Sequence, residues 1–378
     1  MRTGVSTSSS ARTAGRDAAA DACGGDAAAL LVVLVSSALD PQDVLAGIRD
    51  VAPTAPLIGC STAGEITTSG AVSGSVVVAA LGGDGFRART AHAEIEDGDT
   101  RTAGRRLAAQ LVEDVDGGTM LLLSDALGGD QQQLVRGVYD VLGAGVRVVG
   151  GCAGDDLAMR RTTQFQGQAV LRNSVVGAMV HSTGPIGIGL SHGWRRTGEP
   201  MVVTAAEGTT VLALDDRPAL DVYLEALDAP AALVHDRAGL TRFALRHPLG
   251  IERFRGEEIR FISGANPQRR SLECLATVPV GAVAHLMEGD EDSVLQATTA
   301  AGRQAIAALD GLPPIGAIAF DCIARRGVLE PGGVEAEVER LAETIDAPII
   351  GFYTYGEIAR IEGPRGFHNQ TLVVAAFG

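Results

Sequence analysis

Lysine is absent from this sequence of 378 residues, because all 31 residues counted as lysine or arginine are arginine. Cysteine is scarce as well, and the chain has only Cys23, Cys60, Cys152, Cys274 and Cys322. Without lysine there is no P-loop lysine, no Schiff-base lysine for pyridoxal phosphate and no strand lysine of a protein kinase. No two cysteines have the CxxC spacing of a zinc ribbon or a thioredoxin site. These absences exclude five common kinds of site.

Positive charge is in short supply. The formal net charge is −15, whereas nucleic acids and anionic membranes bind to positively charged surfaces. The longest apolar run, Ala27–Val35, has nine residues, and a membrane-spanning helix needs about 20. We therefore expect neither a nucleic-acid partner nor a membrane partner.

The N-terminal segment lacks the apolar core of a secretory signal. Residues 1–25 are rich in Ser, Thr, Ala, Gly and Arg, and we expect them to form a disordered tail. An odd number of cysteines without a secretory signal indicates free thiols in a reducing compartment. The sequence therefore predicts a cytoplasmic protein.

One segment of the chain occurs twice. Ile58–Ile66 (IGCSTAGEI) and Ile350–Ile358 (IGFYTYGEI) are identical at six of nine positions. Similar strand sequences follow both copies, at Val76–Gly82 and Leu372–Gly378, and an apolar strand and a helix precede both. A length of 378 residues fits about two domains, so this repeat predicts two related halves.

A third copy of the pattern is looser. It comprises a strand at Thr119–Leu123, a helix at Gln131–Leu142, a glycine-rich segment at Val146–Asp156 and a strand at Ser174–Val180. An apolar strand, a helix and a second apolar strand form a right-handed βαβ crossover. We therefore predict an α/β fold with two related halves, built from repeated βαβ-plus-strand units around mixed sheets and joined near residue 215.

Several ordered blocks of sequence resemble those of a known family. They are Gly59–Glu65, Val149–Asp156, Gly193-Trp194 with Val202–Thr204, Leu214–Ala219, Gly351–Glu357 and Phe367–Thr371. With these blocks the chain resembles the FIST sensory proteins. The resemblance implies an N-terminal FIST domain at residues 26–215 and a FIST C domain at residues 216–378.

The same resemblance implies a function. Family members are thought to sense small ligands, with amino acids among those proposed, and some bind haem and sense nitric oxide. Others are fused to signalling modules or to an F-box, and this sequence shows no such output module. We therefore expect a sensory protein that binds a small, amino-acid-like ligand and passes the signal to a separate signalling protein.

The loop of the first copy is a candidate ligand site. Cys60, Ser61, Thr62 and Glu65 follow an apolar strand, and open α/β sheets bind ligands outside the carboxyl ends of their strands. Backbone N–H groups would hold the carboxylate of a zwitterion and Glu65 its ammonium group. In the alternative interpretation, Thr62 and Glu65 satisfy buried backbone groups at a tight turn.

The loop of the other copy is the second candidate. It contains two of the four tyrosines of the chain, and a tyrosine with its apolar ring and polar tip suits a half-buried pocket. The candidate residues are Tyr353, Thr354, Tyr355, Glu357, His368 and Asn369. In the alternative interpretation, the tyrosines fill the core and the histidine is structural.

Two other functions stay open. A cysteine-dependent enzyme could use Cys60 or Cys152 as its nucleophile, with His192 or His368 as the base. A haem sensor could use a histidine as the iron ligand, although the chain has no CxxCH attachment motif. The sequence favours neither a metal nor a cofactor, because it contains no metal-ligand spacing.

Overall fold

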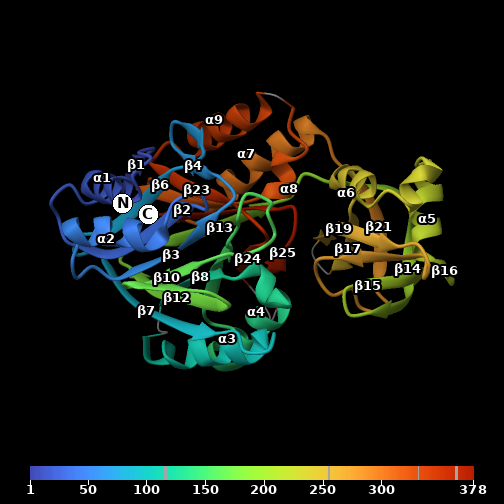
Figure 1. The fold of residues 1–378 in the computed structure, drawn as a ribbon, viewed down its shortest axis with the longest axis horizontal. Coiled ribbons are helices and arrows are strands. Elements are labelled where there is room, and N and C mark those ends of the chain that lie inside the picture. Colours follow the sequence, from blue (N-terminus) through green and yellow to red (C-terminus); the bar gives the residue numbers. More distant parts are fainter. Residues whose placement is uncertain (115–116, 254–255, 331, 362–364) are drawn as a thin grey trace.

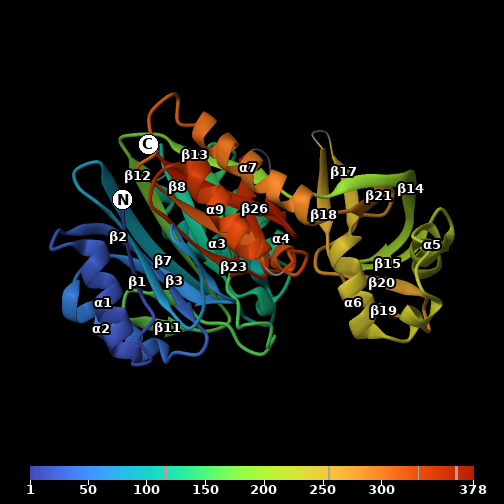
Figure 2. The ribbon, with the colours of Figure 1, turned by 90° about the horizontal axis from the view of Figure 1, so that it is seen from above.

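The protein has a larger body and a smaller lobe (Figures 1 and 2). The structure is a computed structural model that describes residues 1–114, 117–253, 256–330, 332–361 and 365–378. Residues 195–290 form the smaller lobe, and the rest of the chain forms the body.

The body contains three copies of one unit, in which the order is strand, helix, strand, helix, strand, two-stranded hairpin, strand. The first unit comprises β1 (Arg2–Ser6), α1 (Ala11–Cys23), β2 (Ala28–Ser36), α2 (Pro41–Val51), β3 (Leu57–Thr62), β4 (Glu65–Thr67), β5 (Gly70–Val72) and β6 (Val76–Gly82). The second comprises β7 (Phe86–Glu94), α3 (Thr100–Ala109), β8 (Thr119–Ser124), α4 (Gln131–Leu142), β9 (Arg147–Cys152), β10 (Gln164–Gln166), β11 (Ala169–Leu171) and β12 (Ser174–Ser182). The third comprises β13 (Ile186–Ser191), α7 (Glu291–Ala307), β22 (Gly316–Cys322), α9 (Gly333–Ile345), β23 (Ile349–Thr354), β24 (Glu357–Arg360), β25 (Phe367–His368) and β26 (Leu372–Phe377).

Each unit forms one sheet with the same strand order. The orders begin β1-β6-β2-β3, β7-β12-β8-β9 and β13-β26-β22-β23. The two central strands are parallel in every unit and the others antiparallel, as a βαβ crossover requires. The predicted α/β fold of repeated units in mixed sheets is confirmed. The two closely similar segments of the sequence belong to the first and third units.

The hairpins are exchanged between the units. Hairpin β4-β5 of the first unit joins strand β23 of the third, β24-β25 of the third joins β9 of the second, and β10-β11 of the second joins β3 of the first. Every sheet is therefore completed by a neighbouring unit. The exchange forms a closed cycle that holds the body together.

The two helices of a unit approach each other closely at glycine. A Cβ atom on Gly15 of α1 would lie 2.2 Å from the carbonyl oxygen of Val44 on α2. A Cβ atom on Gly104 of α3 would lie 2.3 Å from the carbonyl oxygen of Leu134 on α4. Real atoms cannot approach so closely, so glycine is required at both contacts.

The prediction that residues 1–25 form a disordered tail is wrong. β1 pairs along its length with β6, with Arg2 opposite Ala80. Helix α1 buries small side chains against the body, namely Ala14, Ala18, Ala19 and Ala22. Alanine is a strong helix former, and these alanines bury a face that carries no large apolar residue to mark it in the sequence.

A short motif in the sequence marks this helix. The pentapeptide RTAGR occurs at Arg12–Arg16 in α1 and at Arg101–Arg105 in α3. Its first arginine pairs with an aspartate of the following helix in both units, Arg12 with Asp50 at 2.9 Å and Arg101 with Asp140 at 3.0 Å. The motif therefore identifies the tail as part of the first unit.

The smaller lobe is inserted in the third unit, between β13 and α7. Its strands are β14 (Arg195–Glu207), β15 (Thr210–Leu214), β16 (Arg217–Pro218), β17 (Leu249–Arg253), β18 (Gly256–Arg260), β19 (Ile262–Asn266), β20 (Ser271–Cys274) and β21 (Val283–Glu288). Helices α5 (Ala219–Ala226) and α6 (Arg237–Arg246) cover this sheet. The predicted boundary near residue 215 lies within this lobe, between β15 and β16.

The lobe joins the body through two adjacent strands. Strand β14 enters the lobe and β21 leaves it, and Arg195 pairs with Glu288 where they begin and end. An apolar cluster with Trp194, Ile259 and Val294 spans this junction. None of the described helices is long and apolar enough to cross a membrane.

Candidate functional site

The first predicted loop holds a buried carboxylate. Glu65 begins β4, is 0% exposed and accepts a hydrogen bond from the Thr62 hydroxyl. Its other oxygen accepts from the Ser75 N–H group at 3.3 Å and from the Ser75 hydroxyl. Burial raises the pKa of Glu65. The carboxylate therefore fastens the exchanged hairpin to the core.

The other predicted loop repeats this arrangement. Glu357 begins β24, is 0% exposed and accepts from the Thr354 hydroxyl, three residues before it, and from the Thr371 N–H group at 3.0 Å. Burial raises the pKa of Glu357 to about 8. The two loops are thus equivalent in structure, as the repeat predicts. Both carboxylates accept hydrogen bonds from hydroxyl and N–H groups of the protein.

The cysteines of these loops are equally inaccessible. Cys60 and Cys152 are both 0% exposed, and burial is the main cause that raises the pKa of each thiol. A nucleophilic cysteine needs the opposite shift and access to substrate. Ser61 is 5% exposed and donates to the Gly154 carbonyl at 2.8 Å. The burial and the raised pKa of both thiols argue against a cysteine nucleophile.

The two tyrosines are also part of the core. Tyr353 is 0% exposed, its ring lies 4.9 Å from the guanidinium carbon of Arg326, and its hydroxyl bonds to none of the described residues. The Tyr355 hydroxyl donates to the Asp155 carboxylate at 2.6 Å. Asn369 is 1% exposed. Protein atoms cover these side chains, which agrees with the alternative interpretation that the tyrosines fill the core.

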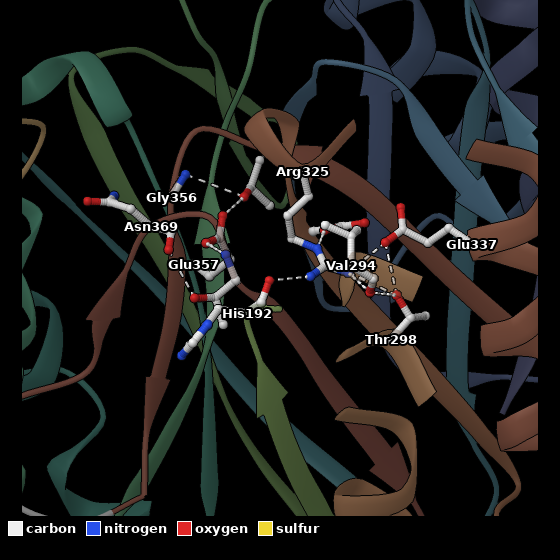
Figure 3. Close-up of polar contacts among 11 residues, drawn as sticks. His192, Val294, Thr298, Arg325, Glu337, Gly356, Glu357 and Asn369 are labelled. Atoms are coloured by element: carbon white, nitrogen blue, oxygen red, sulfur yellow. Dashed lines mark hydrogen bonds and ion pairs between the residues drawn. The ribbon is translucent and has the colours of Figure 1, made fainter. Parts of the chain in front are cut away.

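A buried charge network lies at the end of the third unit's parallel strands (Figure 3). Arg325 of the short helix α8 (Ile323–Arg326) is 0% exposed and bonds to Asp321 at 2.8 Å and to Glu337 at 2.6 Å. It also donates to the Thr298 hydroxyl at 2.9 Å and to the His192 carbonyl at 2.9 Å. The two carboxylates raise the pKa of Arg325 despite its burial. The network ties α7, α9 and β22 to the start of the junction.

The junction between body and lobe contains a cleft of about 430 Å³. The body contributes residues near the ends of β13 and β24 and around β25, and the lobe contributes β17 and β18. The cleft is lined by Leu190, Ser191, His192, Arg253, Glu257, Glu258, Ile259, Ala359, Ile361, Arg365, Gly366, His368 and Thr371. Among the ten predicted site residues, His368 alone borders this cleft.

Two histidines in the cleft have defined tautomers. The Nδ1 atom of His192 accepts from the Trp194 N–H group at 3.0 Å, so the ring proton is on Nε2. Burial lowers the pKa of His192 to about 4. The Nε2 atom of His368 lies 3.1 Å from the Ala359 carbonyl and carries its proton, and burial lowers the pKa of His368 as well. Both rings are neutral at pH 7. His192 therefore offers its Nε2–H group as a donor, and His368 offers its Nδ1 atom as an acceptor.

Charges of both signs lie around the histidines. Glu258 binds Arg253 at 2.8 Å and Arg260 at 2.9 Å, and these arginines hold the pKa of its carboxyl below the usual value against the opposing effect of burial. Glu257 lies 4.0 Å from the His192 Nε2 atom. Arg365 is exposed and makes no ion pair or hydrogen bond with any described residue. The cleft can therefore offer a guanidinium group and a carboxylate to one small molecule.

Most residues of the cleft could not be predicted as a site. The sequence suggests His192 only as a candidate base or haem ligand, and no sequence pattern marks Arg253, Glu257 or Arg365 as functional. These residues lie far apart in the sequence and meet because the smaller lobe is inserted after β13. One sequence feature does lie beside the cleft, namely the Gly193-Trp194 block of the family resemblance, which directly follows His192.

Comparison with known families decides the family of the chain. The family model of the FIST N domain matches residues 29–217, and that of the FIST C domain matches residues 219–360. The chain belongs to the FIST family. FIST domains are generally sensory, ligand-binding domains of signal transduction.

Proteins similar to this chain occur in two mycobacteria and in Methanocaldococcus jannaschii. An uncharacterized protein of Mycobacterium tuberculosis is 27% identical over 387 residues, which cover 99% of this chain and 98% of the relative. An uncharacterized protein of Mycobacterium bovis is 26% identical over 387 residues, covering 99% and 97%. An uncharacterized protein of Methanocaldococcus jannaschii is 26% identical over 253 residues, which cover 61% of this chain and 49% of the relative.

Proposed function

We propose that this FIST protein is a cytoplasmic sensor that binds a small zwitterionic molecule, such as an amino acid, in the cleft between body and lobe. The observation that carries the proposal is that charged groups of both signs line one cleft. Arg365 has no partner among the described residues, and Glu257 lines the same cleft with its carboxylate 4.0 Å from the His192 Nε2 atom. A zwitterion needs a cationic and an anionic group within a single site.

Each group has a role in this proposal. Arg365 and the Nε2–H group of His192 bind the carboxylate of the ligand. Glu257, which shares one oxygen with Arg196 at 3.0 Å, binds the ammonium group with the other. Ile259 and Leu190 provide apolar contact for a side chain of the ligand. A cleft of about 430 Å³ lies within the range of small-molecule sites.

The position of the cleft supports a sensory role. One wall belongs to the body and the other to the lobe, so a ligand that bridges them favours the state in which the walls are close. The lobe is connected through β14 and β21, whose pairing is irregular between Thr197 and Met201. A movement of the lobe would present the ligand-bound state to a separate signalling protein.

Calorimetric titration with a panel of amino acids tests this function. We expect saturable binding of at least one amino acid, and at least a tenfold loss of affinity in Arg365→Gln and in Glu257→Gln, equivalent to about 1.4 kcal/mol. Arg303→Gln is the matched control, because Arg303 is an exposed arginine of α7 outside the cleft. Binding that is equal in all three variants would contradict the proposed site. Absence of binding throughout the panel would contradict the ligand class.

A further inference from the structure

The three units differ in what fills the space at the carboxyl ends of their parallel strands. In the second unit the side chain of Gln131, which is 4% exposed, fills it. Its oxygen accepts from the Ser124 hydroxyl at 2.8 Å, and its nitrogen donates to the carbonyls of Asp125 at 2.8 Å and Gly129 at 3.0 Å. In the third unit, Arg325 and its partners occupy the corresponding end (Figure 3).

The first unit has no such filling side chain. Asp40 caps α2 as Asp130 caps α4, by accepting from the second N–H group of the helix at 2.9 Å and 2.8 Å. This equivalence places Pro41 where the second unit has Gln131. A pocket of about 270 Å³ lies there, between β2, the start of α2, β3 and hairpin β10-β11. It shares no lining residue with the cleft at the junction.

Three side chains of this pocket can still donate hydrogen bonds, because none of the described residues accepts from them. Ser36 is 3% exposed and lines the pocket, and its hydroxyl hydrogen has no acceptor among the described residues. Arg161 and Arg172 also line it, and neither guanidinium group pairs with a described residue. The acid in the lining, Asp40, already accepts from the N–H groups of α2. The Ser36 oxygen accepts from the Ala38 N–H group at 3.4 Å. Two guanidinium groups without a described partner and one hydroxyl hydrogen that can still be donated therefore outweigh one engaged carboxylate.

The backbone of Arg161 is held in place by a strained loop. The Asp155 carboxylate accepts from the N–H groups of residues 159–161 at 2.8 to 2.9 Å. Asp156, Leu157 and Met159 all have positive φ angles, between 51° and 64°. Such a conformation costs about 1–3 kcal/mol for each residue and persists where surrounding contacts enforce it. These contacts hold the loop in one conformation, and Arg161 at its end lines the pocket.

We infer that this pocket is a second binding site, which takes a small molecule bearing an oxyanion, either a phosphate or a carboxylate group. The two guanidinium groups bind the oxyanion, as arginine does in bidentate pairs. The Ser36 hydroxyl donates to it from the floor of the pocket. The carboxyl ends of parallel strands are the usual place for a ligand in open α/β sheets.

Binding of inorganic phosphate and of acetate tests the inference and separates the two anions. We expect saturable calorimetric binding of one of them, which weakens as sodium chloride is added because salt screens exposed charges. Arg161→Gln and Arg172→Gln should each weaken it at least fivefold. Arg242→Gln is the matched control, since Arg242 is an exposed, unpaired arginine of α6 in the smaller lobe.

A filling variant gives a second test that leaves the charges intact. Pro41→Gln places the side chain of the second unit's Gln131 into the first unit, and we expect it to abolish anion binding. Unfolding without anion checks that each variant is folded. Failure of both anions to bind the wild-type protein would overturn the inference, and so would unchanged binding in Arg161→Gln and Arg172→Gln. The variants distinguish the two sites, because Arg161 and Arg172 line only this pocket, whereas Arg365 and Glu257 line only the cleft.

Discussion

The hydroxyl group of Tyr355 donates a hydrogen bond to the carboxylate of Asp155 at 2.6 Å, although 200 residues separate them. The same oxygen accepts from the N–H groups of Asp155 at 3.2 Å and Leu157 at 2.6 Å. One side chain of the third unit thus braces the strained loop of the second.

Replacing this hydroxyl should destabilise the protein. In Tyr355→Phe the two N–H groups lose their acceptor and the carboxylate loses one of its donors, and leaving a buried group unpaired costs about 1–3 kcal/mol. Tyr353→Phe is the matched control, because the Tyr353 hydroxyl has no partner among the described residues and its loss should leave stability unchanged or higher. Denaturant unfolding measures both, and equal effects would contradict the brace. The loop also carries Arg161, so Tyr355→Phe should weaken anion binding as well.

The buried Glu357 should make stability fall as the pH rises. Burial raises its pKa to about 8, whereas an unfolded chain has a glutamate pKa of about 4.3. The folded state therefore holds more protons between these values, and the free energy of unfolding falls with rising pH over that range. Glu357→Gln should flatten this dependence in unfolding curves measured between about pH 5 and pH 9. Glu288→Gln, at an exposed acid, should retain the wild-type slope.

Ligand binding in the cleft should not depend on pH near neutrality. Burial lowers the pKa of His192 to about 4, so its ring stays neutral at every pH well above this value. An ordinary histidine, with a pKa of about 6.5, would change charge in this range. Titrations between about pH 6 and pH 8 should give one affinity, and a loss of binding centred near pH 6.5 would show that His192 or His368 titrates normally. The folded protein should lose stability as the pH falls from about 6.5 towards 4, where the unfolded chain binds the proton first.

The first helix pair should not tolerate a methyl group. A Cβ atom on Gly47 of α2 would lie 2.0 Å from the Arg12 carbonyl of α1. Gly47→Ala forces the helices apart and should cost about 1–3 kcal/mol, as overpacking does elsewhere. Gly145→Ala is the control, since no atom lies within 4 Å of its added Cβ. Thermal unfolding that shows the same midpoint for both variants would contradict the close contact.

Deletion of residues 1–25 should unfold much of the first unit. The deletion removes β1 from the edge of β6 and exposes the face of α2 that α1 covers. We expect a large fall in the unfolding midpoint or an insoluble protein. A disordered tail would instead leave the midpoint unchanged, so differential scanning calorimetry separates the two.

The repeat made most of the body predictable. Identical residues around Glu65 and Glu357 showed that two segments share one structure, and apolar strands flanking a helix showed the crossover. The hairpin exchange could not be predicted, because β-strand pairing between units depends on contacts hundreds of residues apart. The pattern also failed at α1, because its buried face consists of alanine, glycine and one cysteine and has no large apolar residue to mark it.

The candidate site was predictable only in part. A glycine-rich loop with hydroxyls and a carboxylate suits a ligand site and a buried turn equally well, and burial distinguishes them. Glu65 and Glu357 are both 0% exposed, which agrees with the interpretation as buried structural residues. Arg365 and Glu257 form the cleft only because a lobe is inserted between β13 and α7, and no local pattern reports that insertion.

The exchange of hairpins has a consequence for synthesis. Hairpin β4-β5 is made early, yet it pairs with β23, so Thr68 bonds to Ile349 across 281 residues. During synthesis on the ribosome, hairpin β4-β5 stays unpaired until β23 has emerged, near the end of the chain. The body therefore resembles a domain-swapped trimer whose three subunits are joined in a single polypeptide. We expect its units to fold and unfold together rather than one by one.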